Sequence, residues 1–271
     1  MKTETEQPWT TNTLKCPKKT VFGEEHMKFP CPLLLTSVHF LMQWIFSVAL
    51  TEKWSEFWGG EQVRSMSWAQ FLSISLPCGL VTSGDIGLSN LAISRLKITF
   101  YTMVKASTPV FVLLWAYLLG IERITYPLFL VVLIIASGEF LAVRGEVHFQ
   151  LVPFLQCLAA SFLSGARWTL VQLKLQNLDP PLKTMIATMR VLAPSMFVSM
   201  FVIALIIEEP WVKLAHVNSG SQMLETFGLG VLGGTLAIAM IICEFDLIMR
   251  SSAIILMIGG VIKEMITILL G

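Results

Sequence analysis

Long apolar segments separated by short polar connections dominate the hydropathy pattern of the chain. An α-helix needs about 20 mostly apolar residues to cross a bilayer, and each segment is close to that length. The pattern therefore predicts eight transmembrane helices, at Pro30–Thr51, Ala69–Ala92, Ile98–Gly120, Thr125–Val143, Gln150–Gln176, Lys183–Ile207, Glu225–Met249 and Ser251–Leu270.

The connections between these segments are short, so sequence neighbours must pack against each other. We expect residues 30–271 to form one transmembrane helical bundle. Residues 1–29 are polar and lack the apolar core of a signal peptide. We interpret them as a disordered tail.

Composition supports a polytopic membrane protein. The chain has 271 residues, 55% of them hydrophobic and 14% charged, with a mean hydropathy of +0.72. Soluble domains carry about 25% charged residues. A net charge of +1 without basic clusters gives no indication of nucleic-acid binding. The cysteine and histidine spacings fit no metal site, and no nucleophile elbow or phosphate-binding glycine loop occurs. We therefore expect neither an enzyme nor a bound cofactor.

Lys105 is the one formal charge in the apolar run Ile98–Gly120. As a helix this run would be roughly 34 Å long, with the lysine near its middle. A lysine there costs about 2.5–3.5 kcal/mol, so it should face a protein interior or a water-filled cavity. Pro109 has no N–H, which leaves the Lys105 carbonyl without its helical partner. The alternative is a lysine that snorkels or pairs with a buried acid.

Three more cations lie inside predicted spans, at Arg167, Arg190 and Lys263. Four cations on four spans suggest a cavity for a multiply charged anion, such as a phosphate or a sugar nucleotide. Arginine binds phosphate through two N–H groups, and lysine acts as a point charge. The alternative is internal ion pairing, for example of Lys263 with Asp85.

Small residues recur at the spacing that lets membrane helices approach closely. Ser83 and Gly87 form one such pair, and Gly230 and Gly234 form another. We interpret both pairs as ordinary helix packing.

The positions of Lys105 and Lys263 suggest an internal repeat. Both would lie on the fourth span of a five-span repeat if one span were missing at each end of the chain. Secondary transporters are often inverted repeats with a substrate site at the membrane midplane between them.

Three runs resemble one known family: GDIGLSNLAISRLKITFYTMVKASTPVFVLLWAYLLGIE, GARWTLVQLKLQ and EFDLIMRSSAIILMIGGVIKEMITILL. They resemble the triose-phosphate/nucleotide-sugar translocators of the drug/metabolite transporter superfamily. The closest likeness is to subgroup C of solute carrier family 35, the branch linked with GDP-fucose. The resemblance covers roughly residues 29–271.

The resemblance implies a ten-helix, 5+5 inverted-repeat antiporter of Golgi or ER–Golgi intermediate membranes. Such carriers exchange a nucleotide sugar for a nucleoside monophosphate. The family's fourth-helix and ninth-helix lysines fall on Lys105 and Lys263, and its R-W arginine falls on Arg167. Asp85 and Asn90 match a D-x-G-x-S-N run.

One position departs from the plastid phosphate carriers. They have Lys-Arg where this chain has Lys263 and Glu264, which argues against a site built on two adjacent cations. The candidate substrate-binding residues are Lys105, Arg167, Lys263, Tyr101, Asn90 and Arg190. The candidate structural or ion-pairing residues are Asp85, Glu264, Pro109, Gly259 and Gly260.

The resemblance also implies different chain ends. The polar tail stands where family members have a first helix, and the sequence stops where their ninth helix ends. We therefore expect eight helices, without the first and tenth. Two other functions are open: a truncated, non-transporting protein that regulates or binds a full-length relative, and a carrier of another organic anion. The expected partners are the two nucleotides and membrane lipid. A homo- or hetero-oligomer is left open.

Overall fold

A computed structural model describes residues 31–121, 125–145, 150–176, 182, 184–214, 220–256 and 258–260. Within these ranges the chain forms helices and no strand. The helices are α1 (Pro32–Lys53), α2 (Ser55–Trp58), α3 (Gly60–Ser65), α4 (Trp68–Ile93), α5 (Ile98–Lys105), α6 (Thr108–Leu118), α7 (Tyr126–Gly145), α8 (Leu151–Gln176), α9 (Met185–Glu208), α10 (Pro210–Leu214) and α11 (Gly220–Arg250).

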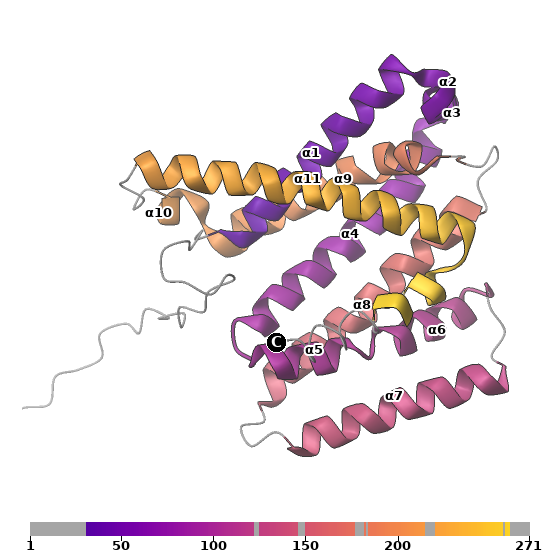
Figure 1. The fold of residues 1–271 in the computed structure, drawn as a ribbon, viewed down its shortest axis with the longest axis vertical. Helices are drawn as coiled ribbons and strands as arrows, with labels where there is room; N and C mark the ends of the chain where they lie inside the picture. The colour runs from indigo at the N-terminus through magenta and orange to yellow at the C-terminus, as the bar shows by residue number, and fades with distance from the viewer. Residues whose placement is uncertain are drawn as a thin grey trace, which may run out of the picture.

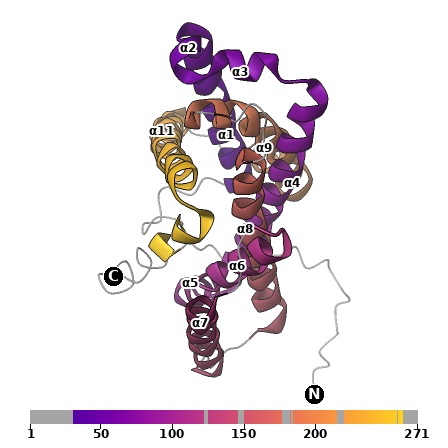
Figure 2. The same ribbon diagram turned by 90° about the vertical axis from the view of Figure 1, so that its right-hand side faces the viewer.

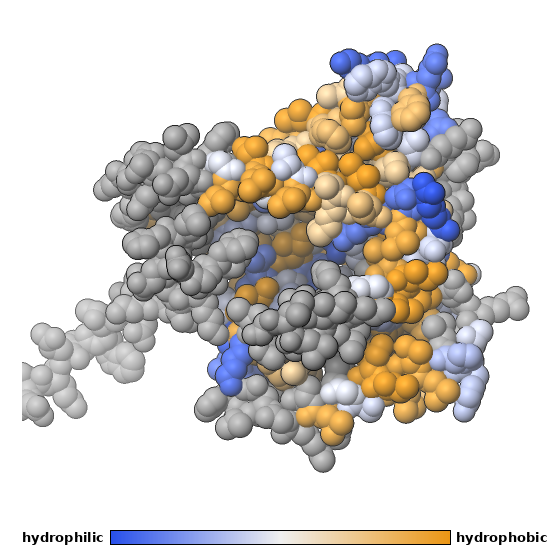
Figure 3. All heavy atoms as spheres, viewed as in Figure 1, coloured by the Kyte–Doolittle hydropathy of each residue, from blue (hydrophilic) through white to orange (hydrophobic). Residues whose placement is uncertain are grey.

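Several of these helices are suited to a bilayer. Among the described residues, four helices are long and apolar enough to cross a membrane: Pro32–Lys53, Trp68–Ile93, Met185–Glu208 and Gly228–Arg250. All four helices carry exposed large hydrophobic side chains, and Figure 3 shows a largely hydrophobic surface on the face turned to the viewer. The predicted class, an all-α polytopic membrane protein, is confirmed.

Most predicted spans agree with a helix to within a few residues. They correspond to α1, α4, α7, α8, α9 and α11. The last predicted span, Ser251–Leu270, is helical at residues 253–256 and 258–260, and the rest of it lies outside the described residues. The polar segment 1–29 also lies outside them.

The predicted span Ile98–Gly120 is two helices, which corrects the expectation of one continuous helix. α5 ends at Lys105 and α6 begins at Thr108. Pro109 has no N–H for the Lys105 carbonyl, and the Thr108 hydroxyl donates to that oxygen instead, at 2.7 Å. The break leaves Lys105 in the last turn of α5, where the negative end of the helix dipole favours a cation.

The helices α4 and α9 form the centre of the bundle (Figures 1 and 2). The helix α9 packs against α1 and α4, and α4 also packs against α8. In turn α8 contacts α5 and α6, while α11 crosses α1. The helix α7 lies at the periphery and contacts α5 and α6.

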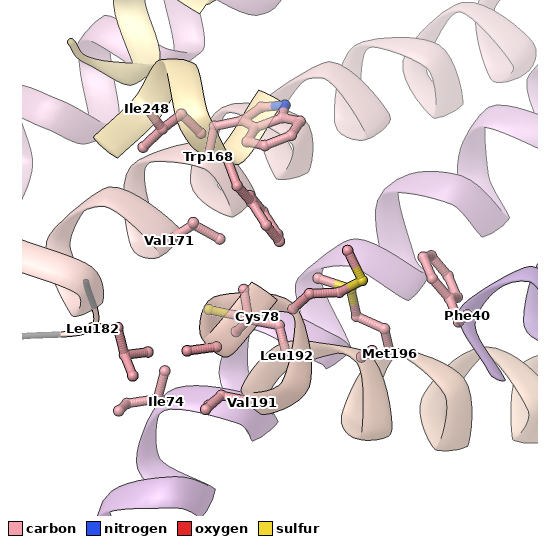
Figure 4. Close-up of a cluster of buried hydrophobic side chains, with 14 of the residues drawn as sticks. Phe40, Ile74, Cys78, Trp168, Val171, Leu182, Val191, Leu192, Met196 and Ile248 are labelled. Atoms are coloured by element: carbon pink, nitrogen blue, oxygen red, sulfur yellow. The ribbon is translucent and has the colours of Figure 1, made fainter. Parts of the chain in front are cut away.

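The main apolar core lies where α4, α8 and α9 meet side chains of α1 and α11 (Figure 4). Lipid tails are as apolar as these side chains, so close packing rather than exclusion of water holds such helices together. The labelled members of the core are Phe40, Ile74, Cys78, Trp168, Val171, Leu182, Val191, Leu192, Met196 and Ile248.

The closest contact between α4 and α9 is made by small residues. A Cβ atom on Gly79 would lie 2.8 Å from the backbone carbonyl carbon of Ser195, so only glycine fits there. The Ser195 hydroxyl donates to the Ser75 carbonyl at 2.5 Å. One turn further on, the hydroxyls of Ser83 and Ser199 lie 2.6 Å apart. The hydrogen bonds and the close contact at Gly79 both fix the alignment of α4 against α9.

The two small-residue pairs singled out in the sequence both lie at helix contacts, with one difference. Ser83 faces α9, but a Cβ on Gly87 would meet its nearest atom only at 3.8 Å. The closest approach therefore lies earlier in α4. Gly230 and Gly234 face α1, where a Cβ on Gly234 would lie 2.6 Å from the Met42 sulfur.

These contacts predict opposite outcomes for two substitutions in the same helix. Alanine replaces a helical glycine with a gain of about 1 kcal/mol, whereas overpacking a tight contact costs about 1–3 kcal/mol. We expect Gly79→Ala to lower the thermal unfolding temperature in detergent and Gly87→Ala to leave it unchanged or raise it. Equal effects of the two substitutions would contradict the α4–α9 contact.

Candidate functional site

Three ionisable side chains from three helices meet inside the bundle: Asp85 of α4, Lys105 of α5 and Arg167 of α8. Lys105 Nζ lies 2.5 Å from Asp85 Oδ1, and Arg167 Nη2 lies 3.6 Å from Asp85 Oδ2. The aspartate side chain is only 5% exposed, against 17% for the lysine and 20% for the arginine. A buried carboxylate thus lies between two cations that retain some access from outside.

Ser89 joins this cluster, although the sequence interpretation did not single it out. Lys105 Nζ donates to its hydroxyl oxygen at 3.0 Å, and that hydroxyl donates to Asp85 Oδ1 at 3.4 Å. The signal was present, since residues four apart lie on one face of a helix and Ser89 belongs to the D-x-G-x-S-N run. These contacts occupy two of the three N–H donors of the ammonium group.

The guanidinium group of Arg167 has weaker polar contacts in this cluster than the ammonium group of Lys105. Its 3.6 Å contact with Asp85 is an ion pair but is too long for a hydrogen bond. Its Nε is buried and has no acceptor among the described residues. The guanidinium carbon lies 4.4 Å from the ring centre of Trp168, a cation–π arrangement. Arg167 is therefore positioned by its neighbours and retains donors for a further acceptor.

A close helix contact brings Arg167 to this level. A Cβ on Gly165 would lie 2.7 Å from the backbone carbonyl carbon of Phe111, so α8 and α6 approach as closely as glycine allows. One turn later, the Thr169 hydroxyl lies 3.4 Å from the Val112 carbonyl oxygen. The break between α5 and α6 and this contact act together, because they place the ends of both helices beside α8.

The other predicted residues take separate places. Tyr101 lies one turn before the cluster lysine and packs, half-buried, against a second apolar cluster. The Asn90 amide donates to a carbonyl of its own helix at 2.9 Å. Gly259 and Gly260 are helical, and a Cβ on either would meet no described atom within 4 Å. Lys263 and Glu264 lie outside the described residues.

Arg190 is not brought to this cluster. Its Nη1 donates to the Thr51 hydroxyl at 2.6 Å and its Nη2 to Glu52 Oε1 at 2.8 Å. These contacts lie at the start of α9, in a pocket that Phe71 of α4 also lines. Asp85 follows Phe71 by about four turns of α4, roughly 21 Å. The four predicted cations therefore occupy at least two regions.

Internal ion pairing, the alternative stated for these cations, is present at Asp85. Lys105 pairs with this buried acid, and Asp85 also contacts Arg167. The pairing of Asp85 with Lys263 remains a prediction, because Lys263 lies outside the described residues. Within the same residues, no three His, Cys, Asp or Glu side chains are grouped so that they could hold a metal ion. Two cations on one carboxylate leave the described part of the cluster with an excess of positive charge.

The sequence of the chain matches the model of a known protein family. The family model described as "Triose-phosphate Transporter family" matches residues 18–271. The chain belongs to this family. Its members include transporters, and the chain is accordingly an integral membrane protein of a transporter family. No solved structure matches the chain significantly.

Relatives of this Triose-phosphate Transporter family member carry two kinds of name. The chain is 33% identical, over 92% of its own length, to "Probable sugar phosphate/phosphate translocator At1g06470" of Arabidopsis thaliana, and it covers 60% of that relative. It is 24% identical over 89% of its length to "Putative nucleotide-sugar transporter YMD8" of Saccharomyces cerevisiae, of which it covers 70%. The chain thus spans less than two thirds of the Arabidopsis relative.

The cluster predicts that Asp85 matters more to stability than an exposed acid in a similar ion pair. Asp85→Asn leaves two partly buried cations without their carboxylate, and breaking such a pair costs about 3–5 kcal/mol. Asp246 pairs with Arg250 at 2.9 Å on the surface, where a pair contributes about 0–1 kcal/mol. We expect Asp85→Asn to lower the thermal unfolding temperature in detergent far more than Asp246→Asn.

The double variant Asp85→Asn/Lys105→Met serves as a second control, because it removes one of the two uncompensated cations. It should recover part of the unfolding temperature lost in Asp85→Asn. If the double variant is no more stable than the single one, charge pairing is not what stabilises the cluster.

Proposed function

We propose that this transporter carries a nucleotide sugar, GDP-fucose, in exchange for a nucleoside monophosphate. The observation that supports this proposal is the Asp85–Lys105–Arg167 cluster. It has more positive than negative charge, and Arg167 has a buried Nε without an acceptor among the described residues. A diphosphate group supplies several oxygen acceptors and the missing negative charge.

Arg167 and Lys105 would bind the phosphate groups in different ways. A guanidinium group binds phosphate oxygens through parallel N–H donors, which favours one orientation of the anion. The ammonium group of Lys105 is a compact charge that can exchange the Asp85 carboxylate for a phosphate oxygen. Lys263 would supply a further charge from the second half of the chain, as the family resemblance implies. Alternating access would follow from rocking one repeat against the other.

The proposed location is a Golgi or ER–Golgi intermediate membrane, where nucleotide sugars are consumed. It rests on the resemblance to the GDP-fucose-linked branch and on the yeast relative, which is named a nucleotide-sugar transporter. Tyr101 and Asn90 remain proposed contacts of the same ligand, since both lie within about one turn of the cluster on α5 and α4.

A second candidate function is exchange of a sugar phosphate for inorganic phosphate. The observation that favours it is the 33% identity to a plant relative with that name. Both candidates require cations that bind phosphoryl oxygens. They differ in whether a base and a second phosphate are also bound.

The decisive experiment is counter-exchange in reconstituted vesicles. We expect labelled GDP-fucose to enter vesicles preloaded with GMP, and glucose 6-phosphate to enter poorly when the vesicles hold phosphate. The reverse preference would support the second candidate. Exchange of neither pair, by protein that is folded in detergent, would favour the alternative of a protein that does not transport.

Variants test the role of charge in the same vesicles. Lys105→Met and Lys263→Met should each abolish exchange, whereas Lys263→Arg keeps the charge in another shape and should retain part of it. Arg250→Gln is the matched control, since Arg250 is 77% exposed on the surface. Full exchange by either methionine variant would contradict the electrostatic mechanism.

A further inference from the structure

A second positively charged site lies at one end of the bundle, well separated from Asp85. It is a pocket of about 510 Å³ between α1, α3, α4 and α9. Its walls include Arg64, Arg190, Trp44, Trp68, Phe71 and Pro194. We call it the arginine pocket. Its lining combines two cations with aromatic and aliphatic side chains.

The charges in the arginine pocket are fixed by one shared acid. Glu52 Oε1 accepts from Arg190 Nη2 at 2.8 Å, and its other oxygen contacts Arg64 Nη2. Two arginines share one carboxylate, so the pocket keeps an excess positive charge. Arg190 uses one donor for Thr51 and one for Glu52, and a guanidinium group has five. Donors are therefore left for an anionic ligand.

We infer from the ends of the candidate spans that the pocket lies where a bilayer changes from headgroups to acyl chains. Three candidate spans have an end here, since α1 ends at Lys53, α4 begins at Trp68 and α9 begins at Met185. Figure 3 shows hydrophilic atoms gathered at the end of the molecule that carries α2 and α3, with hydrophobic atoms beside them. Trp68 is 79% exposed, as aromatic residues at membrane interfaces often are.

The apolar wall of the pocket extends from this level into the membrane. Trp44 lies nine residues before the end of α1, roughly 14 Å along a helix. Pro194 lies nine residues after the start of α9. The charged part of the pocket thus lies at headgroup depth, and its apolar part lies beside the upper acyl chain. This polarity gradient matches an amphipathic ligand better than a wholly soluble one.

We propose that the arginine pocket binds an anionic phospholipid. The phosphate of the headgroup contacts Arg64 and Arg190, and an acyl chain lies along Trp44, Phe71 and Pro194. Basic pockets at the ends of transmembrane helices bind such headgroups by charge. The bound lipid would link α1, α3, α4 and α9 at one end of the bundle. The proposal does not depend on the transported substrate.

Binding of phosphatidylserine, measured by native mass spectrometry of protein released from nanodiscs, tests the proposal. We expect phosphatidylserine to remain bound from mixed nanodiscs and phosphatidylcholine to be lost. Arg64→Gln and Arg190→Gln should each weaken phosphatidylserine binding roughly fivefold, the effect of one basic residue near an anionic surface. Arg250→Gln, at an exposed span end beside an acid, should bind the lipid normally.

Glu52→Gln gives a result of opposite sign. It removes the only acid that contacts the two arginines in the described residues, so phosphatidylserine should bind roughly fivefold more tightly. A purely structural role of the Arg64–Glu52–Arg190 contacts would instead weaken binding. Arg64 is 52% exposed, so its variant should fold even if Arg190→Gln does not.

Soluble phosphates form the last arm of the experiment. GMP and inorganic phosphate are added at rising concentration to protein that holds phosphatidylserine. We expect neither to displace the lipid. Displacement by either, or equal retention of phosphatidylserine and phosphatidylcholine, would overturn the proposal. In the first case the arginine pocket would be an entry site for the transported anion.

Discussion

The pairing of two cations with the single carboxylate of Asp85 is the constraint that shapes the middle of this protein. An unpaired charge at the centre of a bilayer costs about 2.5–3.5 kcal/mol even on the mildest scale. Asp85 lies on α4, whereas Lys105 and Arg167 come from α5 and α8. The three helices must therefore meet at one level. The break between α5 and α6 and the glycine contact between α8 and α6 are local features that make this meeting sterically feasible.

A different kind of contact fixes α1 to α9. At one end, the Glu208 carboxylate accepts from the backbone N–H groups of Leu33 and Leu34 at 2.7 and 2.9 Å, which satisfies donors at the start of α1. At the other end, Arg190 bonds Thr51 and Glu52. The two helices thus run antiparallel and are tied at both ends. They form a frame against which α4 packs, and α4 carries the central carboxylate.

Much of this architecture could be predicted from the sequence, because it follows from apolar length. The ends of six helices agree with the apolar segments, and the cations Lys105 and Arg167 were identified as interior charges from their position alone. The break after Lys105 could not be placed, although Pro109 signalled the lost hydrogen bond. A proline can either bend a helix or end it. The sequence does not indicate that the Thr108 hydroxyl replaces the missing N–H donor and that the helix ends here.

Partners in space were harder to predict than positions in the chain. Glycine spacing indicated close packing at Gly87, but the register of α4 on α9 places the tight contact at Gly79, opposite Ser195. Arg190 had the same sequence features as Arg167, an arginine within an apolar span. Only the antiparallel pairing of α1 with α9 places it beside Glu52, at the end of α1 rather than beside Asp85. The partner of each residue depends on how the helices are aligned against each other, and the type of the residue alone does not predict this alignment.

Under the proposed function, the ion pairs of Asp85 suit an anion-binding site better than an apolar contact would. A buried ion pair contributes little net stability, since desolvation offsets most of the attraction. An entering anion can therefore replace the carboxylate at small cost, provided that it satisfies the same cations. Arg167 already holds its guanidinium group against Trp168 with an Nε that lacks an acceptor among the described residues. Under the proposed function, the ligand completes that hydrogen bonding, and Asp85 keeps the empty site electrically tolerable between transport cycles.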